Sequence, residues 1–195
     1  MEVGLRIEEG ALALAKSYTN SQGALNNMKK QKGFSLIELL IVVAIILIIA
    51  AIAIPNLLRS KMAANEASAV GSIRTINTAQ VTYSSTYGVG YTTLAQLSTP
   101  AGGCVAASAL LACLLDSNLG GGVKSGYNFT SVAANGAGTT ASPFITFDSV
   151  AWPVALGQSG QNAFCSDESG VIRRDTTGTQ GLGAACETSG LPPLQ

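Results

Sequence analysis

Residues 28–60 decide the fold, and they read MKKQKGFSLIELLIVVAIILIIAAIAIPNLLRS. From Phe34 to Leu58 the only charged side chain is Glu38. The uncharged run from Leu39 to Leu58 has the length of about 20 residues that a helix needs to cross the core of a bilayer. Three lysines precede it, and by the positive-inside rule they keep that flank in the cytoplasm. The sequence therefore predicts a single-pass helix with the later residues outside the cytoplasm. The lysines are Lys29, Lys30 and Lys32.

The helical pattern continues beyond the uncharged run. Apolar side chains recur there at helical spacing, which predicts that one stripe of the helix packs on a core. Small polar side chains mark another face, and Gly88 and Gly90 supply an end. We therefore expect one helix of roughly 50 residues, about 80 Å long, from Phe34 to near Tyr87. The apolar stripe is Val70, Ile73, Ile76, Tyr83 and Tyr87, and the polar face is Ser68, Ser72, Thr75, Thr78 and Thr82.

The remaining chain predicts a small sheet. Residues 88–125 are rich in loop formers, with a short helical or turn piece expected at 106–115. Later β-prone runs are separated by Gly, Asn and Ser clusters, which predicts short antiparallel strands. A sheet must cover its apolar face, and the helical stripe is the available cover. The predicted fold class is α+β: a long N-terminal helix packed on a small antiparallel sheet with a disulfide-closed C-terminal loop. The expected strands are Tyr127–Val132, Pro143–Val150, Ala163–Ser166 and Val171–Arg173.

Composition argues against an enzyme and against a nucleic-acid binder. The chain has no histidine and a formal net charge of zero. Without histidine it lacks the usual proton shuttle and the commonest metal ligand, and balanced charge gives no electrostatic footprint for nucleic acid. We therefore assign no catalytic residue, no cofactor and no metal ligand. The acidic turn at Asp167 and Glu168 gathers too few oxygen atoms to complete a calcium site.

Four cysteines follow the apolar run, and none forms a CxxC pair. An even number of cysteines outside the cytoplasm predicts disulfides, because that compartment is oxidising. Four cysteines allow three pairings. Since closing a loop costs more as it lengthens, we favour pairing neighbours in the sequence. The favoured disulfides are Cys104–Cys113 and Cys165–Cys186.

The stretch GFSLIELL at residues 33–40, followed by Ile, Val and Ala residues, resembles the N-terminal signature of type IV pilins and type II secretion pseudopilins. The resemblance extends through Pro55. It implies that a prepilin peptidase cuts between Gly33 and Phe34 on the cytoplasmic side and methylates the new amine of Phe34. Glycine suits such a cut because no side chain obstructs the backbone. The mature chain would then be Phe34–Gln195.

The resemblance also implies assembly roles for Glu38 and Pro55. A carboxylate in an apolar segment costs a few kcal/mol unless it finds a partner, and in the family the Phe34 amine of a neighbouring subunit supplies one. Pro55 lies where the family's helix kinks; it lacks a backbone donor and clashes with the carbonyl of Ala51, so we expect a kink or a locally melted turn. The plain alternatives are a Glu38 at headgroup level without a partner, and a membrane-helix proline without a role.

These features define three segments: a leader at 1–33, a transmembrane and filament-core helix at 34–58, and an extracytoplasmic headgroup at 59–195. The implied function is that of a structural subunit of a type IV pilus-like filament. The precursor would reside in the bacterial inner membrane and the product in a surface or periplasmic filament. Implied partners are other copies of the chain, the prepilin peptidase, an inner-membrane assembly platform, an assembly ATPase and the membrane. A role in adhesion, motility, DNA uptake or secretion stays open.

Alternatives remain at this stage. Within the family, the chain can be a pseudopilin of a type II secretion system. Outside it, the same segment can anchor a monomeric extracytoplasmic binding domain. An ordinary secretory signal with the motif Ala51-x-Ala53 is disfavoured, because Glu38 interrupts its apolar core and Pro55 follows the cut closely. Translation can begin at Met28, which would make residues 1–27 an artefact, or the leader is unusually long.

Overall fold

The computed structural model describes residues 33–179, 186 and 190–194. The chain divides into two units, Met1–Ile49 and Ala50–Gln195. The long helix α2, Leu36–Tyr87, contributes residues to both units. Most of the predicted leader, residues 1–32, lies outside the described residues.

The first unit is described from Gly33 to Ile49, and α2 begins within it at Leu36. Every side chain in this stretch is exposed. The sequence here is Leu, Ile, Val and Ala around the whole circumference, apart from Glu38 in the first turn. A helix that is apolar on all sides is covered by lipid or by other apolar helices, because it presents no face suited to water.

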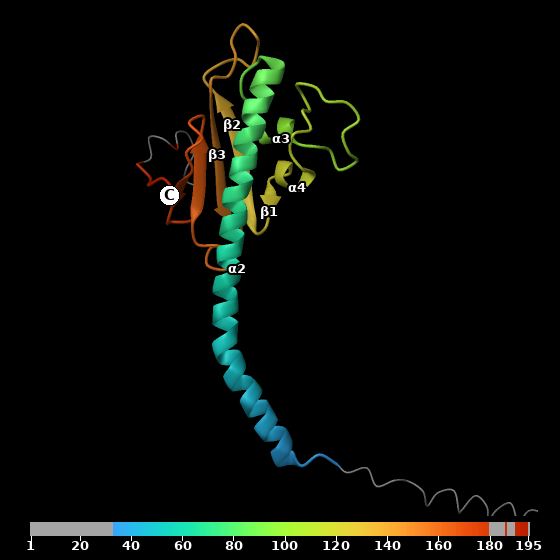
Figure 1. The fold of residues 1–195 in the computed structure, drawn as a ribbon, viewed down its shortest axis with the longest axis vertical. Coiled ribbons are helices and arrows are strands. Elements are labelled where there is room, and N and C mark those ends of the chain that lie inside the picture. Colours follow the sequence, from blue (N-terminus) through green and yellow to red (C-terminus); the bar gives the residue numbers. More distant parts are fainter. Residues whose placement is uncertain (1–32, 180–185, 187–189, 195) are drawn as a thin grey trace, which may run out of the picture. The chain divides into compact units, whose positions relative to one another are not determined.

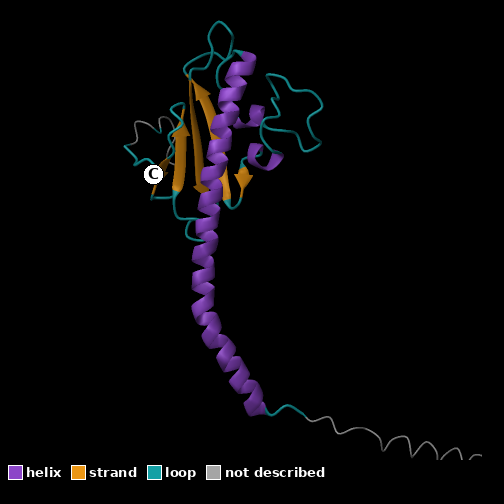
Figure 2. Ribbon diagram, viewed as in Figure 1, coloured by secondary structure: helices purple, strands orange, loops and turns teal. Residues whose placement is uncertain are grey.

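In the second unit, α2 lies across one face of a five-stranded sheet (Figures 1 and 2). The predicted stripe is confirmed: Ile73, Ile76 and Tyr83 are buried, and Val70 and Tyr87 pack at its edge. The polar face is exposed at Thr75, Thr78 and Thr82, whereas Ser72 is buried at its margin. The buried side chains of the helix are Ala69, Ser72, Ile73, Ile76, Ala79, Gln80 and Tyr83.

The sheet is an antiparallel meander in which the strands follow one another in chain order. Its long central pair, β2 and β3, is held in register from Tyr127 opposite Pro153 to Ala134 opposite Thr146. The fold class that the sequence predicts is thereby confirmed. The strands are β1 Val123–Lys124, β2 Tyr127–Ala134, β3 Thr146–Pro153, β4 Ala163–Asp167 and β5 Arg173–Asp175.

Alternation along the strands separates two clusters of buried side chains. Phe129, Ala151 and Phe164 stand opposite one another on adjacent strands and join the core that contains α2. The alternate residues Val150 and Cys165 are also cross-strand partners, and they form a second, smaller cluster on the other face of the sheet. Cys186, Trp152 and Leu191 complete that second cluster.

Both predicted disulfides are present. Cys165 and Cys186 are bonded and buried, so the C-terminal segment is held on the sheet face opposite α2. Cys104 and Cys113 close a short loop whose residues 104–108 are exposed. The hydroxyl of Tyr83 donates a hydrogen bond of 2.6 Å to the carbonyl of Ala109, which ties this loop to α2.

A buried polar seam joins α2 to its surroundings at Gln80, which is 0% exposed. Its Nε2 donates to the carbonyl of Thr92 at 2.6 Å and to Oγ of Ser131 at 2.9 Å. Its Oε1 accepts from the backbone N–H of Thr92 at 2.9 Å, and Ser131 shares a hydrogen bond with Ser149 on β3. Because buried amides are costly without partners, this seam fixes the position of the helix relative to β2 and β3.

The chain turns back to the sheet directly after α2 ends. Gly90 has a φ of 84° and bridges to Phe144, and a side chain at this glycine would collide with the Phe144 backbone. The connection then carries two short helices, α3 Leu94–Leu97 and α4 Ser117–Gly120. Asp116 caps α4 by accepting hydrogen bonds from the N–H groups of Asn118 and Leu119.

Residues 106–115, predicted as a short helical or turn piece, form turns with a short bridge between Ser108 and Leu111. Other local expectations need correction. β3 begins at Thr146, where its ladder with β2 starts, instead of at the predicted Pro143. β5 begins at Arg173 instead of Val171. Strand β1 and helices α3 and α4 were not predicted, because elements this short carry too few residues to show a period.

Candidate processing and assembly segment

The predicted cleavage position lies directly before the start of α2. Gly33, Phe34 and Ser35 precede the helix, and the carbonyl of Ser35 accepts the first helical hydrogen bond, from the N–H of Leu39 at 3.2 Å. No atom beyond the chain neighbours lies within 4 Å of a Cβ built on Gly33. Among the described residues, the space that a side chain at Gly33 would occupy is therefore empty.

Glu38 lies in the first turn of α2. A negative charge there interacts favourably with the partial positive charge of a helix N-terminus. Ser35 and Glu38 also have the Ser-x-x-Glu spacing of a capping box, a signal that our reading of the sequence did not use. Among the described residues, the Glu38 carboxylate makes no hydrogen bond or ion pair. Its charge is thus available to a group outside the subunit.

The apolar side chains that follow Glu38 are exposed throughout. From Phe34 to Leu58 the large apolar side chains range from 46% exposed, at Val43, to 78% exposed, at Phe34. In the part of the chain that the structure describes, α2 is the helix that is long and apolar enough to cross a membrane. Soluble monomers rarely expose apolar patches beyond a few hundred Å². This segment therefore requires a membrane or a protein partner to cover it.

Pro55 lies inside α2, and the helix is continuous on both sides of it. The locally melted turn that we considered is absent from this structure. Pro55 leaves the carbonyl of Ala51 without its helical donor. Two side chains just beyond Pro55 bond back to the helix: Asn56 Nδ2 donates to the carbonyl of Ile52 at 3.1 Å, and Ser60 Oγ donates to that of Asn56 at 3.0 Å.

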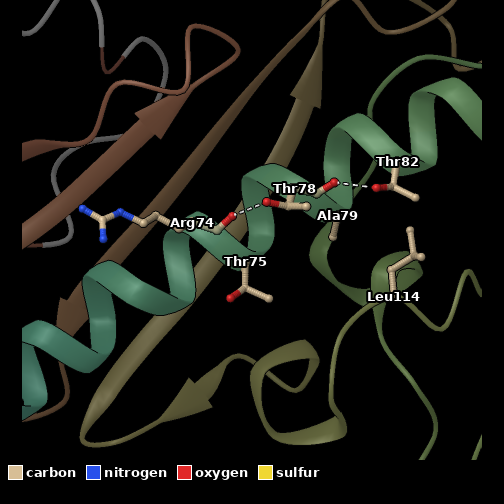
Figure 3. A pocket seen from close by; sticks show the side chains of 6 residues that line it. All are labelled: Arg74, Thr75, Thr78, Ala79, Thr82 and Leu114. Atoms are coloured by element: carbon tan, nitrogen blue, oxygen red, sulfur yellow. Dashed lines mark hydrogen bonds between the residues drawn. The ribbon is translucent and has the colours of Figure 1, made fainter.

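Two hollows flank α2 in the second unit. One, of about 370 Å³, lies between the threonine face of the helix and Leu114 (Figure 3). Its threonines bond to the helix itself, since Thr78 Oγ1 donates to the carbonyl of Arg74 and Thr82 Oγ1 to that of Thr78. The other, of about 410 Å³, lies beside Arg59 and Glu66. Neither hollow contains a nucleophile activated by a base, and the described residues include no group of three potential metal ligands.

Two ionisable groups of the headgroup have shifted pKa values, and both have structural causes. Hydrogen bonds from the Leu119 backbone and from Lys124 hold the pKa of Asp116 below its usual range. Burial raises the pKa of Tyr127, and the nearby Glu66 carboxylate adds to the effect. The Tyr127 hydroxyl donates to the carbonyl of Asn162 at 2.9 Å. The side chains of Asp116 and Tyr127 therefore stabilise the local structure through these hydrogen bonds.

Comparison with known proteins bears on the N-terminal segment. Residues 28–54 match the family described as the prokaryotic N-terminal methylation motif. Over 39 residues the chain is 62% identical to the type IV wide pilus major component PilA4 of Thermus thermophilus. By its N-terminal segment the chain is therefore similar to type IV pilins. The matched stretch is 20% of this chain and 30% of that relative, so the likeness covers under a third of the relative's length. No solved structure matches the chain.

The similarity of this segment to a pilin agrees with the prediction of a structural, non-enzymatic protein. The N-terminal motif and the exposed apolar helix also agree with a membrane-anchored precursor. The headgroup, from residue 59 onward, is outside the matched motif. Its sheet, disulfides and buried seam are thus properties read from this chain alone.

Proposed function

We propose that the chain is the precursor of a structural subunit of a type IV pilus-like filament. The observation that carries this proposal is the exposed apolar surface from Phe34 to Leu58, with one unpaired carboxylate in its first turn. A bilayer covers this surface in the precursor. In the filament the same surface packs against the apolar helices of other copies, which exclude water as the bilayer did.

Processing precedes assembly in this proposal. The prepilin peptidase cuts between Gly33 and Phe34, removes the leader at 1–33, or at 28–33 if translation begins at Met28, and methylates the Phe34 amine. Two observations support this step: the matched family is described as a methylation motif, and no described residue occupies the space beside Gly33. The subunit Phe34–Gln195 then consists of the membrane and filament helix at 34–58 and the extracytoplasmic headgroup at 59–195.

Assembly uses the charge that processing creates. Before cleavage the Phe34 nitrogen is an amide, and after it an ammonium group that has no partner within its own apolar segment. Glu38 of a neighbouring copy supplies that partner and sets the axial stagger between subunits. Pro55 marks the turn at which the helix is weakest and can unwind during packing. An inner-membrane platform and its ATPase extract the subunit from the membrane.

Pseudopilins and pilins share all these N-terminal features. The relative matched here is described as a pilus major component, which supports the pilus over the secretion pseudopilus. A monomeric membrane-anchored binding domain would need neither the cut nor the unpaired carboxylate.

Intact mass of the protein recovered from its native host tests the processing step. We expect a chain that begins at Phe34 and carries one added methyl group. Gly33→Leu should leave uncleaved precursor in the membrane, because the leucine side chain fills the space that the peptidase needs, whereas the control Gln31→Leu should be processed normally. A product that begins at Ile54, as after secretory signal cleavage, or an uncleaved wild-type chain would refute the proposal.

A further inference from the structure

The hollow beside Arg59 lies in the second unit, between two segments of the chain that are hydrogen-bonded to each other. It is lined by one face of α2 and by the connection between β3 and β4, and the carboxylate of Glu66 joins the two. Glu66 Oε1 accepts from the N–H groups of Gln161 at 2.8 Å and Asn162 at 3.2 Å, and its Oε2 accepts from Asn162 Nδ2 at 2.9 Å. The lining residues are Arg59, Met62, Ala63, Glu66, Gln161 and Asn162.

The hollow presents charges of opposite sign at its two ends. A carboxylate has about four lone-pair positions, and three hydrogen bonds leave Glu66 with one of them, on Oε2. Arg59 is exposed, and within the described part of the chain its guanidinium has no hydrogen bond or ion pair. Seven residues separate the two groups along α2, which corresponds to about 10 Å.

The position of the hollow along α2 sets its depth relative to a bilayer. Arg59 directly follows the uncharged run that ends at Leu58. When that run fills the hydrocarbon core, the headgroup layer beyond it is about 5–8 Å thick. At 1.5 Å per residue, Arg59 and Ala63 lie within this layer, and Glu66 lies about 12 Å beyond Leu58, roughly 4–7 Å outside it. The Arg59 end of the hollow is thus level with the lipid headgroups, and the Glu66 end lies on their aqueous side.

We propose that this hollow binds the headgroup of a zwitterionic phospholipid of the extracytoplasmic leaflet. The phosphate is held by the guanidinium of Arg59, which can donate two parallel hydrogen bonds to it. The primary ammonium group of the same headgroup donates to the free lone pair of Glu66. Met62 and Ala63, between these ends, contact the ethylene group that joins the phosphate to the ammonium. The inference rests on the proposed membrane-anchored precursor, and it means that extraction into a filament must release one bound lipid.

The test uses the full chain reconstituted in vesicles of equal parts phosphatidylethanolamine and phosphatidylglycerol, then released in mild detergent for native mass spectrometry. We expect the retained lipid to be mainly phosphatidylethanolamine, since phosphatidylglycerol lacks the ammonium group. Arg59→Gln should lower the retained fraction roughly tenfold, because it removes a charge-assisted contact. Lys61→Gln is the matched control: Lys61 lies at the same depth but does not line the hollow. This control should retain lipid as the wild type does.

Several results would overturn the inference: equal retention by Arg59→Gln, an equal loss in Lys61→Gln, or retention of phosphatidylglycerol as strong as that of phosphatidylethanolamine. Inorganic phosphate in the detergent should not displace the lipid, and displacement by it would show a free-anion site instead. Alkaline carbonate extraction of the same vesicles separates the two proposals. If the chain leaves the vesicles, the membrane-anchored precursor itself is contradicted. If the chain stays while Arg59→Gln retains lipid, only the proposed lipid-binding site is contradicted.

Discussion

One helix, α2, is stabilised in two different ways along its length. From Phe34 to Leu58 its apolar side chains face outward on every side. From Arg59 to Tyr87 it buries a single stripe against the sheet and presents threonines to solvent. The backbone conformation is the same in both parts. The distribution of apolar side chains around the helix therefore decides what can cover it: its own sheet in the second part and, in the proposed function, lipid or other subunits in the first.

The largest expected difference in stability comes from replacing an isoleucine by alanine in each part of α2. Ile73 is 0% exposed and Ile48 is 64% exposed. Ile73→Ala should lower the free energy of unfolding of the headgroup by roughly 2–5 kcal/mol, because it leaves a cavity in the core. Ile48→Ala should change it by less than about 0.5 kcal/mol. Urea unfolding of the detergent-solubilised chain measures both changes, with the fluorescence of its one tryptophan, Trp152, as the signal. Equal effects would contradict the difference between the two parts of α2.

A lysine introduced at two equally exposed positions of α2, one in each part, tests whether lipid or water surrounds that position. Ile46 and Val81 are 57% and 58% exposed in the isolated subunit. Ile46→Lys should weaken membrane insertion by about 3 kcal/mol, because it places an ammonium group near the centre of the span. Val81→Lys should leave both insertion and unfolding unchanged within about 0.5 kcal/mol. The fraction of chain that resists carbonate extraction reports the difference, and full resistance of Ile46→Lys would contradict the assignment of the span.

A substitution at Gln80 tests whether the buried seam holds the second part of α2 on the sheet. Gln80→Leu removes three hydrogen bonds, leaves the buried N–H and carbonyl of Thr92 without these partners, and leaves Ser131 with its bond to Ser149. We expect a loss of about 2 kcal/mol in the free energy of unfolding. The exposed Thr82→Val, on the opposite face of α2, serves as control and should be nearly neutral. A Gln80→Leu chain as stable as wild type would show that the seam is not needed to hold the helix.

The smallest effect concerns Asp116, the cap of α4. Its pKa is lowered in the folded chain, so its contribution to stability is present at neutral pH, above the unfolded pKa of about 3.9, and is lost as the pH falls through the folded pKa. Asp116→Asn keeps a capping side chain and removes the charge. Because the group is exposed, we expect a loss of only about 0.5 kcal/mol at pH 7, and a difference from wild type that shrinks as the pH falls below the unfolded pKa. A difference that stays constant as the pH falls would exclude the charge as its source.

Sequence alone predicted the long helix, its buried stripe and the sheet, because each has a clear period or length. It also predicted both disulfides, since the favoured pairs are neighbours along the chain. It did not predict β1, α3 and α4, which are too short to show a period. The role of Gln80 was missed because its partners, Thr92 and Ser131, become neighbours only in the fold. The same holds for Glu66, whose partners lie in the connection between β3 and β4.

For Glu38 two roles can be compared, a local one at the start of α2 and pairing with a neighbouring copy, and one measurement separates them. Glutamine serves as well as glutamate in a capping box, so Glu38→Gln keeps the local helix start and removes only the charge. If Glu38 acts as a cap, this variant should behave as wild type. If it pairs with the Phe34 ammonium of a neighbouring copy, its loss strands a buried charge at a cost of about 3–5 kcal/mol for every subunit added.

The decisive measurement is the yield of filaments sheared from cells in which Glu38→Gln is the only subunit, quantified by electron microscopy beside wild type. The same cells report, by intact mass and carbonate extraction, whether the variant is cleaved after Gly33 and retained in the membrane. We predict normal cleavage, normal retention and no filaments. A normal filament yield from Glu38→Gln would contradict the charge pairing on which the proposed assembly depends.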